Sequence, residues 1–344
     1  VVAVRGLERY SGENAEVDVA DDGTLRRIVL TDDPAARVLV RSQEGTEVPV
    51  EATGAGPLVV DLDTVGAGFR LDGPARIESE DGRLVITAEG SLAGTRAADG
   101  TQLTVAARRA VRAEQGERRL STEALDAVFL ADDVGTVRIV SNGPTRMSGP
   151  DDNGRLTTVD VAGELELFAR GEQWEIPIAR GVRVDAVGGD QRFRATAGLL
   201  RDLDWGDRTF RAEGGVSWVG VFGEGDARTA RLLPDGSAVL TGESGAPARF
   251  YVRPGLLAAD AAPDIESASF AALEIELRET GDAARIDARG EVIASVDGIL
   301  EDYDLDSDGA IFEVFPPDAT GRQPFALSAQ VVRRVRLIAP EEVT

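Results

Sequence analysis

Residues 210–218 decide the fold class, because their polarity alternates along the chain. They read Phe210-Arg211-Ala212-Glu213-Gly214-Gly215-Val216-Ser217-Trp218. The apolar side chains fall on one face of an extended chain and the charged and hydroxyl side chains on the other, which is typical of a half-buried β-strand. Two glycines inside such a strand indicate a bulge or a bend. The stretch therefore predicts one strand with a break in its middle.

The same period of two recurs on both sides of this stretch. Leu273, Ile275 and Leu277 alternate with charged residues, and residues 286–296 repeat the pattern. Turn signals such as Asp81-Gly82 separate the alternating runs. Residues 100–130 are rich in alanine and arginine and would also suit a helix, but their alternation favours strands. We therefore expect an all-β chain of antiparallel strands with one buried face.

A short glycine-centred phrase also recurs. Its copies are Leu71-Asp72-Gly73-Pro74-Ala75, Ala179-Arg180-Gly181-Val182, Ala212-Glu213-Gly214-Gly215-Val216 and Ala288-Arg289-Gly290-Glu291-Val292. Between copies lie an alternating strand, a turn and a second strand, and units of this kind stack so that neighbours share one core. The 344 residues are enough for two such segments. We expect an N-terminal segment over 1–165 and a C-terminal segment over 166–344.

The composition excludes several kinds of chemistry. The chain has no cysteine and no histidine, and all 37 of its basic residues are arginine. Disulfides, thiol nucleophiles, the usual zinc ligands, Schiff-base lysines and the commonest general base are therefore missing. The net charge of −24 repels phosphates, so we expect no nucleic-acid partner.

The repeated phrase and the residues around it resemble a known family. Ala227–Leu233, Pro234-Asp235-Gly236, Ala238–Leu240 and Thr241-Gly242 follow one another, and Ile265–Leu277 then precedes the next copy of the phrase. This order resembles the OstA-like family of lipopolysaccharide-transport periplasmic proteins (LptA, LptC and the amino-terminal part of LptD), best over residues 160–315. The resemblance implies an elongated antiparallel β-jelly roll, a folded sheet stack with an apolar groove for acyl chains.

The resemblance also implies a function, a location and partners. We expect a non-enzymatic lipid-binding or bridge protein of the periplasm or cell envelope, with no cofactor. Its partners would be lipopolysaccharide or another glycolipid, and homologous β-jelly-roll proteins joined edge to edge. Small inward residues would leave room for acyl chains, whose burial contributes about 0.8 kcal/mol per methylene. The groove candidates are Phe193, Phe210, Val216, Trp218, Phe222, Leu240 and Phe250.

Two other functions fit the same sequence. The groove candidates would equally fill an ordinary β-sandwich core, in a scaffold or surface protein that assembles through exposed strand edges. A carboxylate-based glycan enzyme on a β-solenoid is the second alternative, although so acidic a chain singles out no catalytic pair.

Residues 304–311 match the first eight positions of a calcium-binding loop. Asp304, Asp306 and Asp308 stand at positions 1, 3 and 5, followed by Gly309. The acid expected at position 12 is replaced by Phe315. The alternative is a plain hairpin turn between 298–303 and 310–315, since Asp-Gly also favours hairpins. Both predictions place a loop here.

Overall fold

β-strands build the computed structural model, and among the described residues none lies in a helix, which confirms the all-β class. The structure describes residues 1–338 except 7, 42–44, 46, 63–67, 80–83, 133–134, 151–153, 155, 172, 189–190, 205–208, 221–222, 236, 253–261, 264, 281–282, 299–301, 317 and 321. Within this part, no helix is long and apolar enough to cross a membrane.

The chain divides into two units, each with its own internal contacts. Unit 1 comprises Val1–Asn153 and Thr158–Arg180, and unit 2 comprises Gly154–Thr157 and Gly181–Thr344. The main division therefore falls after Arg180, at the second copy of the repeated phrase, and not at the expected position 165/166.

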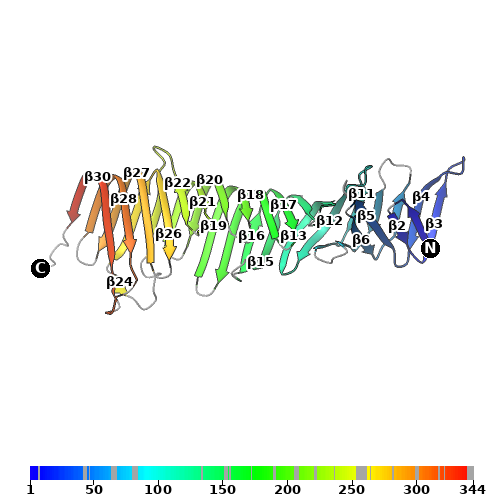
Figure 1. Ribbon diagram of the computed structural model, residues 1–344, viewed down its shortest axis with the longest axis horizontal. Helices are drawn as coiled ribbons and strands as arrows, with labels where there is room; N and C mark the ends of the chain where they lie inside the picture. Colours follow the sequence, from blue (N-terminus) through cyan, green and yellow to red (C-terminus); the bar gives the residue numbers. More distant parts are fainter. Residues whose placement is uncertain are drawn as a thin grey trace. The chain divides into compact units, whose positions relative to one another are not determined.

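The strands of unit 1, with β16 and β18 continuing into unit 2, are given first (Figure 1). They are β1 (Val2–Arg5), β2 (Glu8–Ser11), β3 (Asn14–Val19), β4 (Leu25–Thr31), β5 (Ala35–Arg41), β6 (Glu47–Gly54), β7 (Leu58–Asp61), β8 (Gly68–Asp72), β9 (Ala75–Ser79), β10 (Leu84–Ala88), β11 (Ser91–Arg96), β12 (Gln102–Gln115), β13 (Arg118–Leu130), β14 (Val137–Asn142), β15 (Thr145–Pro150), β16 (Leu156–Val161), β17 (Glu164–Arg170) and β18 (Gln173–Gly188).

Strands β19 to β30 lie in unit 2 and follow the same numbering. They are β19 (Gln191–Asp204), β20 (Phe210–Val219), β21 (Gly223–Leu232), β22 (Ala238–Thr241), β23 (Ala248–Val252), β24 (Ala262–Pro263), β25 (Ile265–Ala272), β26 (Glu274–Thr280), β27 (Ala283–Gly298), β28 (Asp302–Val314), β29 (Arg322–Gln323) and β30 (Phe325–Ile338).

Unit 1 consists of two antiparallel layers between which the chain passes back and forth. Layer A contains β3, β4, β7, β8, β11, the first half of β12, the second half of β13, β14, β17 and the start of β18. Layer B contains β1, β2, β5, β6, β9, β10, the second half of β12, the first half of β13 and β15. The long strands β12 and β13 belong to both layers, so the unit is a folded sheet.

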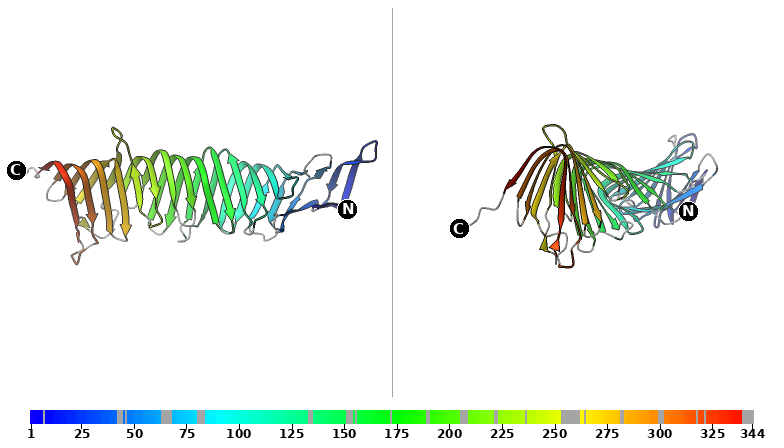
Figure 2. Two further views of the ribbon diagram at one scale, coloured as in Figure 1. Left: turned by 45° about the horizontal axis from the view of Figure 1, so that its top comes forward. Right: turned by 60° about the vertical axis from the view of Figure 1, so that its left-hand side comes forward.

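Unit 2 repeats this plan with longer strands. Layer C contains the first half of β20, the second half of β21, β22, β26, the first half of β27, the second half of β28 and the first half of β30. Layer D contains the remaining halves of these long strands together with β23 and β25. The strands of this unit, yellow to red, pass over a common ridge in the right-hand view of Figure 2.

The bend, defined here as the place where strands cross between layers, is built in one recurring way. In each of three long hairpins, two residues with positive φ on one strand lie opposite a single residue on its partner. The pairs and their opposing residues are Arg109-Ala110 and Glu123, Gly214-Gly215 and Arg228, and Gly290-Glu291 and Asp308. This extra residue interrupts the register and turns the strand from one layer into the other.

The repeated phrase marks this bend, because its glycines adopt the left-handed conformation that it requires. Gly73, Gly181, Gly214 and Gly290 have φ of 91°, 64°, 80° and 74°, a region that glycine enters without steric cost. Backbone hydrogen bonds continue across the bend, for example from the Leu273 amide to the Gly290 carbonyl at 2.9 Å. The expected break in the strand at 214–215 is confirmed.

Candidate functional site

The core of unit 2 contains most of the described groove candidates. Val216, Trp218, Leu240 and Phe250 are buried in one cluster, and Phe210 packs half-buried against it. Phe193 belongs to β19, but its side chain lies outside the described part, as does the whole of Phe222. The alternation therefore identified side chains that meet in three dimensions, although they fill a core between layers C and D.

A glycine positions the two largest rings of this cluster. Trp218 and Phe250 lie on either side of Gly225 in the register of layer D. Their rings stack across it with centroids 5.6 Å apart. A Cβ on Gly225 would lie 2.6 Å from Trp218 Nε1, so no larger residue fits without displacing the ring. The sequence pattern missed Gly225 because a glycine has no side chain to alternate.

A second group of rings joins the two layers. Phe270 of layer D contacts Phe312 of layer C with centroids 5.3 Å apart, and Phe312 contacts Phe325 of β30 at 5.8 Å. Such pairs contribute about 0.5–1.5 kcal/mol beyond their buried area. Sequence reasoning did not select these residues, although the alternation of Ala268, Phe270 and Ala272 was a usable signal.

Small residues lie beside the bend and do not leave open space. Ala272, Ala288 and Ala248 are 0% exposed, so no water-sized space adjoins them. Larger side chains stand farther from the bend, where the layers diverge. The void lined by Phe250, Val252, Leu277, Ile286 and their neighbours measures about 10 Å³, which is room for about one water molecule. Alanine occupies these positions because the two layers come close together beside the bend. The expectation that the small residues make room for acyl chains is not supported.

The side of the core opposite the bend, called the far side below, is closed in unit 1 by polar side chains. Gln115 of layer B donates to the Gly171 carbonyl and accepts from the Trp174 indole of layer A. Near the N-terminal strands, Glu8 of layer B lies 3.2 Å from Arg96 of layer A and accepts from the Tyr10 hydroxyl at 2.9 Å. Burial, together with the Glu8 carboxylate, raises the pKa of Tyr10 well above its usual range.

The far side of unit 2 is crossed by backbone instead. β24, from the connection between β23 and β25 of layer D, pairs in parallel with β29, from the connection between β28 and β30. This two-stranded sheet links the far ends of the two layers. Partly buried apolar side chains, including Phe210, Tyr303, Phe325 and Leu327, lie at the margin of the core.

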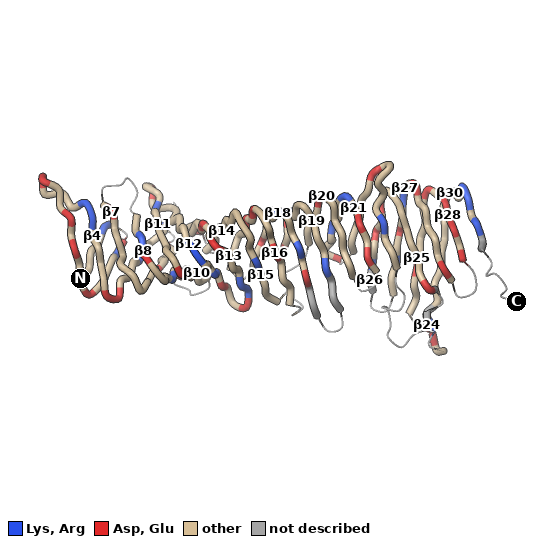
Figure 3. The backbone as a smooth tube through the Cα atoms, turned by 180° about the vertical axis from the view of Figure 1, so that it is seen from behind, with Lys and Arg blue, Asp and Glu red and all other residues tan. Residues whose placement is uncertain are grey.

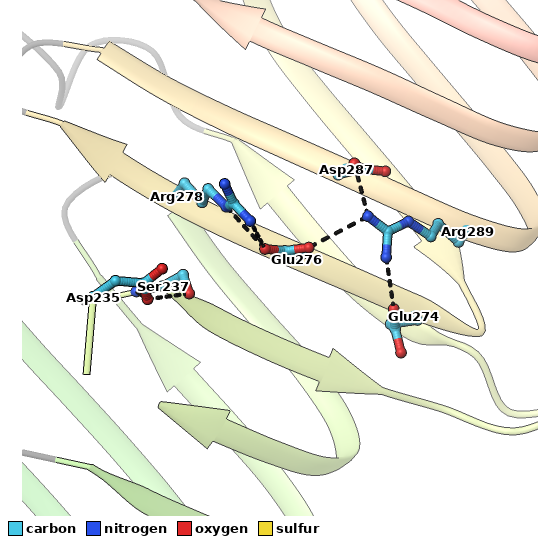
Figure 4. A network of polar contacts seen from close by, with 7 residues as sticks. All are labelled: Asp235, Ser237, Glu274, Glu276, Arg278, Asp287 and Arg289. Atoms are coloured by element: carbon cyan, nitrogen blue, oxygen red, sulfur yellow. Dashed lines mark hydrogen bonds and ion pairs between the residues drawn. The ribbon is translucent and has the colours of Figure 1, made fainter. Parts of the chain in front are cut away.

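The outer face of layer C carries a network of paired charges (Figure 4). The Arg289 guanidinium contacts Asp287 at 3.0 Å, Glu274 at 3.3 Å and Glu276 at 3.4 Å, and Arg278 donates to Glu276 at 2.8 Å. The hydrogen bond with Asp287 raises the pKa of Arg289. Glu274, Glu276 and Asp287 therefore each pair with an arginine on this face.

The calcium-loop residues lie in a continuous strand, which contradicts both loop predictions. β28 pairs with β27 and β30 along its length. Asp304 accepts a hydrogen bond from Ser295 Oγ at 2.9 Å, and Asp308 pairs with Arg333 at the bend. No group of three acidic residues arranged for a metal ion occurs in the described part of the chain. The sequence match arose because aspartates alternate along a strand, which spreads them apart instead of closing a cage.

The terminal strands carry much of the exposed apolar surface. β1, β3 and β30 each pair with one neighbour among the described strands. Their exposed valines are Val2 (52%), Val4 (70%), Val17 (47%), Val19 (50%), Val331 (70%), Val332 (48%) and Val335 (57%). An edge of this kind presents unpaired backbone groups to another strand.

Comparisons with known proteins identify no relative, so any functional proposal rests on the geometric features described above. The sequence matches no protein-family model, no curated protein and no solved structure.

Proposed function

We propose that the chain is a non-enzymatic assembly module that joins other β-proteins, or further copies of itself, through its terminal strand edges. The observation that carries this proposal is the gathering of exposed valines on β1, β3 and β30. Valine is the residue type that a strand buries when a neighbouring strand pairs beside it. The filled cores of both units support a role in which the interior is structural.

The charges on the two edges support head-to-tail pairing. β3 carries Glu16 and Asp18, whereas the second half of β30 carries Arg333, Arg334 and Arg336. Pairing of β30 from one copy with the acidic edge of another would bring opposite charges together, which favours association and fixes its orientation. Two equivalent edges of the same sign would repel one another.

The assembly proposal is tested by sedimentation velocity over a concentration series. The V331D/V335D double variant places two carboxylates on the β30 edge and is expected to remain monomeric where the unmodified protein associates. V219D is the control for an added carboxylate elsewhere, because Val219 is 45% exposed on β20, away from the terminal edges. Equal association of all three proteins would contradict the proposal, and a monomer at every concentration would exclude the joining of identical copies.

Lipid carriage by unit 2 is the second candidate function, and the expected periplasmic or envelope location belongs to it. It rests on the family resemblance and on the half-buried apolar residues at the far side, such as Phe210 and Phe325. Because the void in this core measures about 10 Å³, an acyl chain would enter by separating layers C and D. The free energy that drives this opening would come from burial of methylenes, at about 0.8 kcal/mol each.

Photocrosslinking distinguishes the two candidates. A photoreactive residue at Phe210 or Trp218 is expected to label glycolipid in cells if unit 2 carries lipid, and the same residue at Val219, exposed on β20, is not. Labelling of protein alone from the core positions would exclude lipid carriage and leave the assembly proposal intact.

A further inference from the structure

We propose that the outer face of layer D binds an anionic oligosaccharide. The site lies on the opposite side of layer D from the core, and its last strand is β30, whose valine edge takes part in the proposed assembly. It goes beyond both candidate functions, because the ligand would lie on the face of layer D and not at a strand edge or in the core. It consists of a shallow valley of about 450 Å³ across β23, β25, β27, β28 and β30.

The register of layer D arranges the lining side chains in two parallel rows. The first row is Arg249, Ala271, Ile293, Asp306 and Arg334, and the second row is Tyr251, Ser269, Ser295, Asp304 and Arg336. Directly opposed residues in neighbouring antiparallel strands share a face. The two rows therefore lie side by side on the outer surface.

The shape of the valley follows from the size of these residues. Short side chains (Ala271, Ser269 and Ser295) form much of its floor, from which Ile293 of β27 projects, and long side chains stand on the first and last strands. Strands are about 4.8 Å apart, so the walls on β23 and β30 are about 19 Å from each other. This length suits several linked sugar rings better than a single small molecule.

The walls provide donors for an anionic group. Among the described residues, Arg249, Arg334 and Arg336 have no carboxylate within ion-pair distance, although their neighbour Arg333 contacts both Asp306 and Asp308. Arg249 stands on the first strand of the valley, and Arg334 and Arg336 stand on the last. Guanidinium groups bind carboxylate and phosphate oxygens in a bidentate manner.

The remaining lining residues favour a sugar over other anions. Tyr251 is 43% exposed and Ile293 is 64% exposed, and they offer apolar surface to the faces of sugar rings. Asp304, held by Ser295, and Asp306 are acceptors for hydroxyl groups. In Figure 3 the acidic residues of β28 and the basic residues of β30 lie on neighbouring strands. A polyphosphate would be repelled by these aspartates, whereas a hydroxyl-rich acid uses both kinds of group.

The experiment is isothermal titration of the full chain with tri-galacturonic acid, using maltotriose as the neutral probe. We expect the uronate to bind more tightly than maltotriose and more weakly as salt rises. Loss of charge-assisted hydrogen bonds in the R334A/R336A variant should weaken binding by about tenfold or more. The Y251A variant should bind both tri-galacturonic acid and maltotriose more weakly.

The R211A/R231A variant is the matched control, since Arg211 and Arg231 are exposed on β20 and β21 in layer C and their loss removes the same charge elsewhere. Thermal unfolding verifies that every variant is folded. No uronate binding, or equal weakening by R211A/R231A and R334A/R336A, would overturn the proposal.

Discussion

Unit 1 and unit 2 close the same kind of folded sheet by different means. In unit 1, polar side chains join the far ends of the layers, through Gln115 with Trp174 and through Glu8 with Arg96. In unit 2, rings such as Phe270 and Phe312 fill the widening core, and the β24–β29 backbone pair crosses the far side. The difference shows that the bend determines how the layers converge. The far side can be closed either by polar side-chain contacts or by aromatic packing with a pair of backbone strands.

The largest effect is expected from removing a ring that joins the layers of unit 2. Phe270→Ala should lower the free energy of unfolding by about 3–5 kcal/mol, because a cavity replaces a fully buried ring. Phe129→Ala in unit 1 is the matched variant, since Phe129 is also buried. Denaturant unfolding should show a greater loss of unfolding free energy for Phe270→Ala than for Phe129→Ala. An equal loss in the two variants would mean that the units do not differ in this respect.

The polar closure of unit 1 is tested by breaking one of its hydrogen bonds. Gln115→Leu should cost about 1–3 kcal/mol, because the buried Trp174 indole loses its Gln115 acceptor. Trp174→Phe removes the donor and keeps most of the ring. If the two side chains act together, the double variant will cost less than the sum of the single ones in a double-mutant cycle. Strict additivity would show that the contact contributes no stability.

Substitutions at the bend should have opposite signs in the two units. Gly290→Ala should destabilise unit 2 by about 1–2 kcal/mol, because a side chain is strained at positive φ. Arg109 has φ of 70° at the equivalent bend of unit 1. Arg109→Gly should therefore stabilise the protein by about 0.5–1 kcal/mol. Thermal melting measures the change in stability of both variants. If Arg109→Gly destabilises the protein, the contacts of the Arg109 side chain contribute more than the backbone strain costs.

The smallest effect concerns acid stability and should be similar in both units. Ser237 lowers the pKa of Asp235 in unit 2, and the Thr101 amide and hydroxyl lower the pKa of Asp99 in unit 1. A depressed pKa gives stability that is present above the unfolded value of about 3.8 and is lost as pH falls through the folded value. The free energy of unfolding should therefore fall less between pH 6 and pH 2.5 in Asp99→Asn or Asp235→Asn than in the unmodified protein. An equal fall in the variants and the unmodified protein would contradict this assignment.

Local sequence pattern predicted much of the fold. The alternation of Phe210, Ala212 and Val216 identified a buried face, and the recurring glycines marked the bends at Gly73, Gly181 and Gly290. Both signals are local, because side-chain direction and positive φ are decided within a few residues. The bend at Arg109-Ala110 was missed because it contains no glycine.

The rest depended on contacts between distant residues. Gln115 and Trp174 are 59 positions apart, and no local pattern pairs them. The alternation at Asp304, Asp306 and Asp308 looked like a loop because strand and calcium-loop ligands share a spacing of two. The row of arginines and Tyr251 across layer D appears only once five strands are aligned in register.

The long hairpins have a consequence for how such a chain can lengthen during evolution. Each hairpin of the type β12–β13, β20–β21 or β27–β28 contributes two strands to each layer and brings its own two-against-one bend. It is therefore a self-contained unit for duplication. Copying one hairpin would widen both layers equally and preserve the inward direction of every existing side chain, whereas gain or loss of a single residue within a layer would reverse that direction for half a strand.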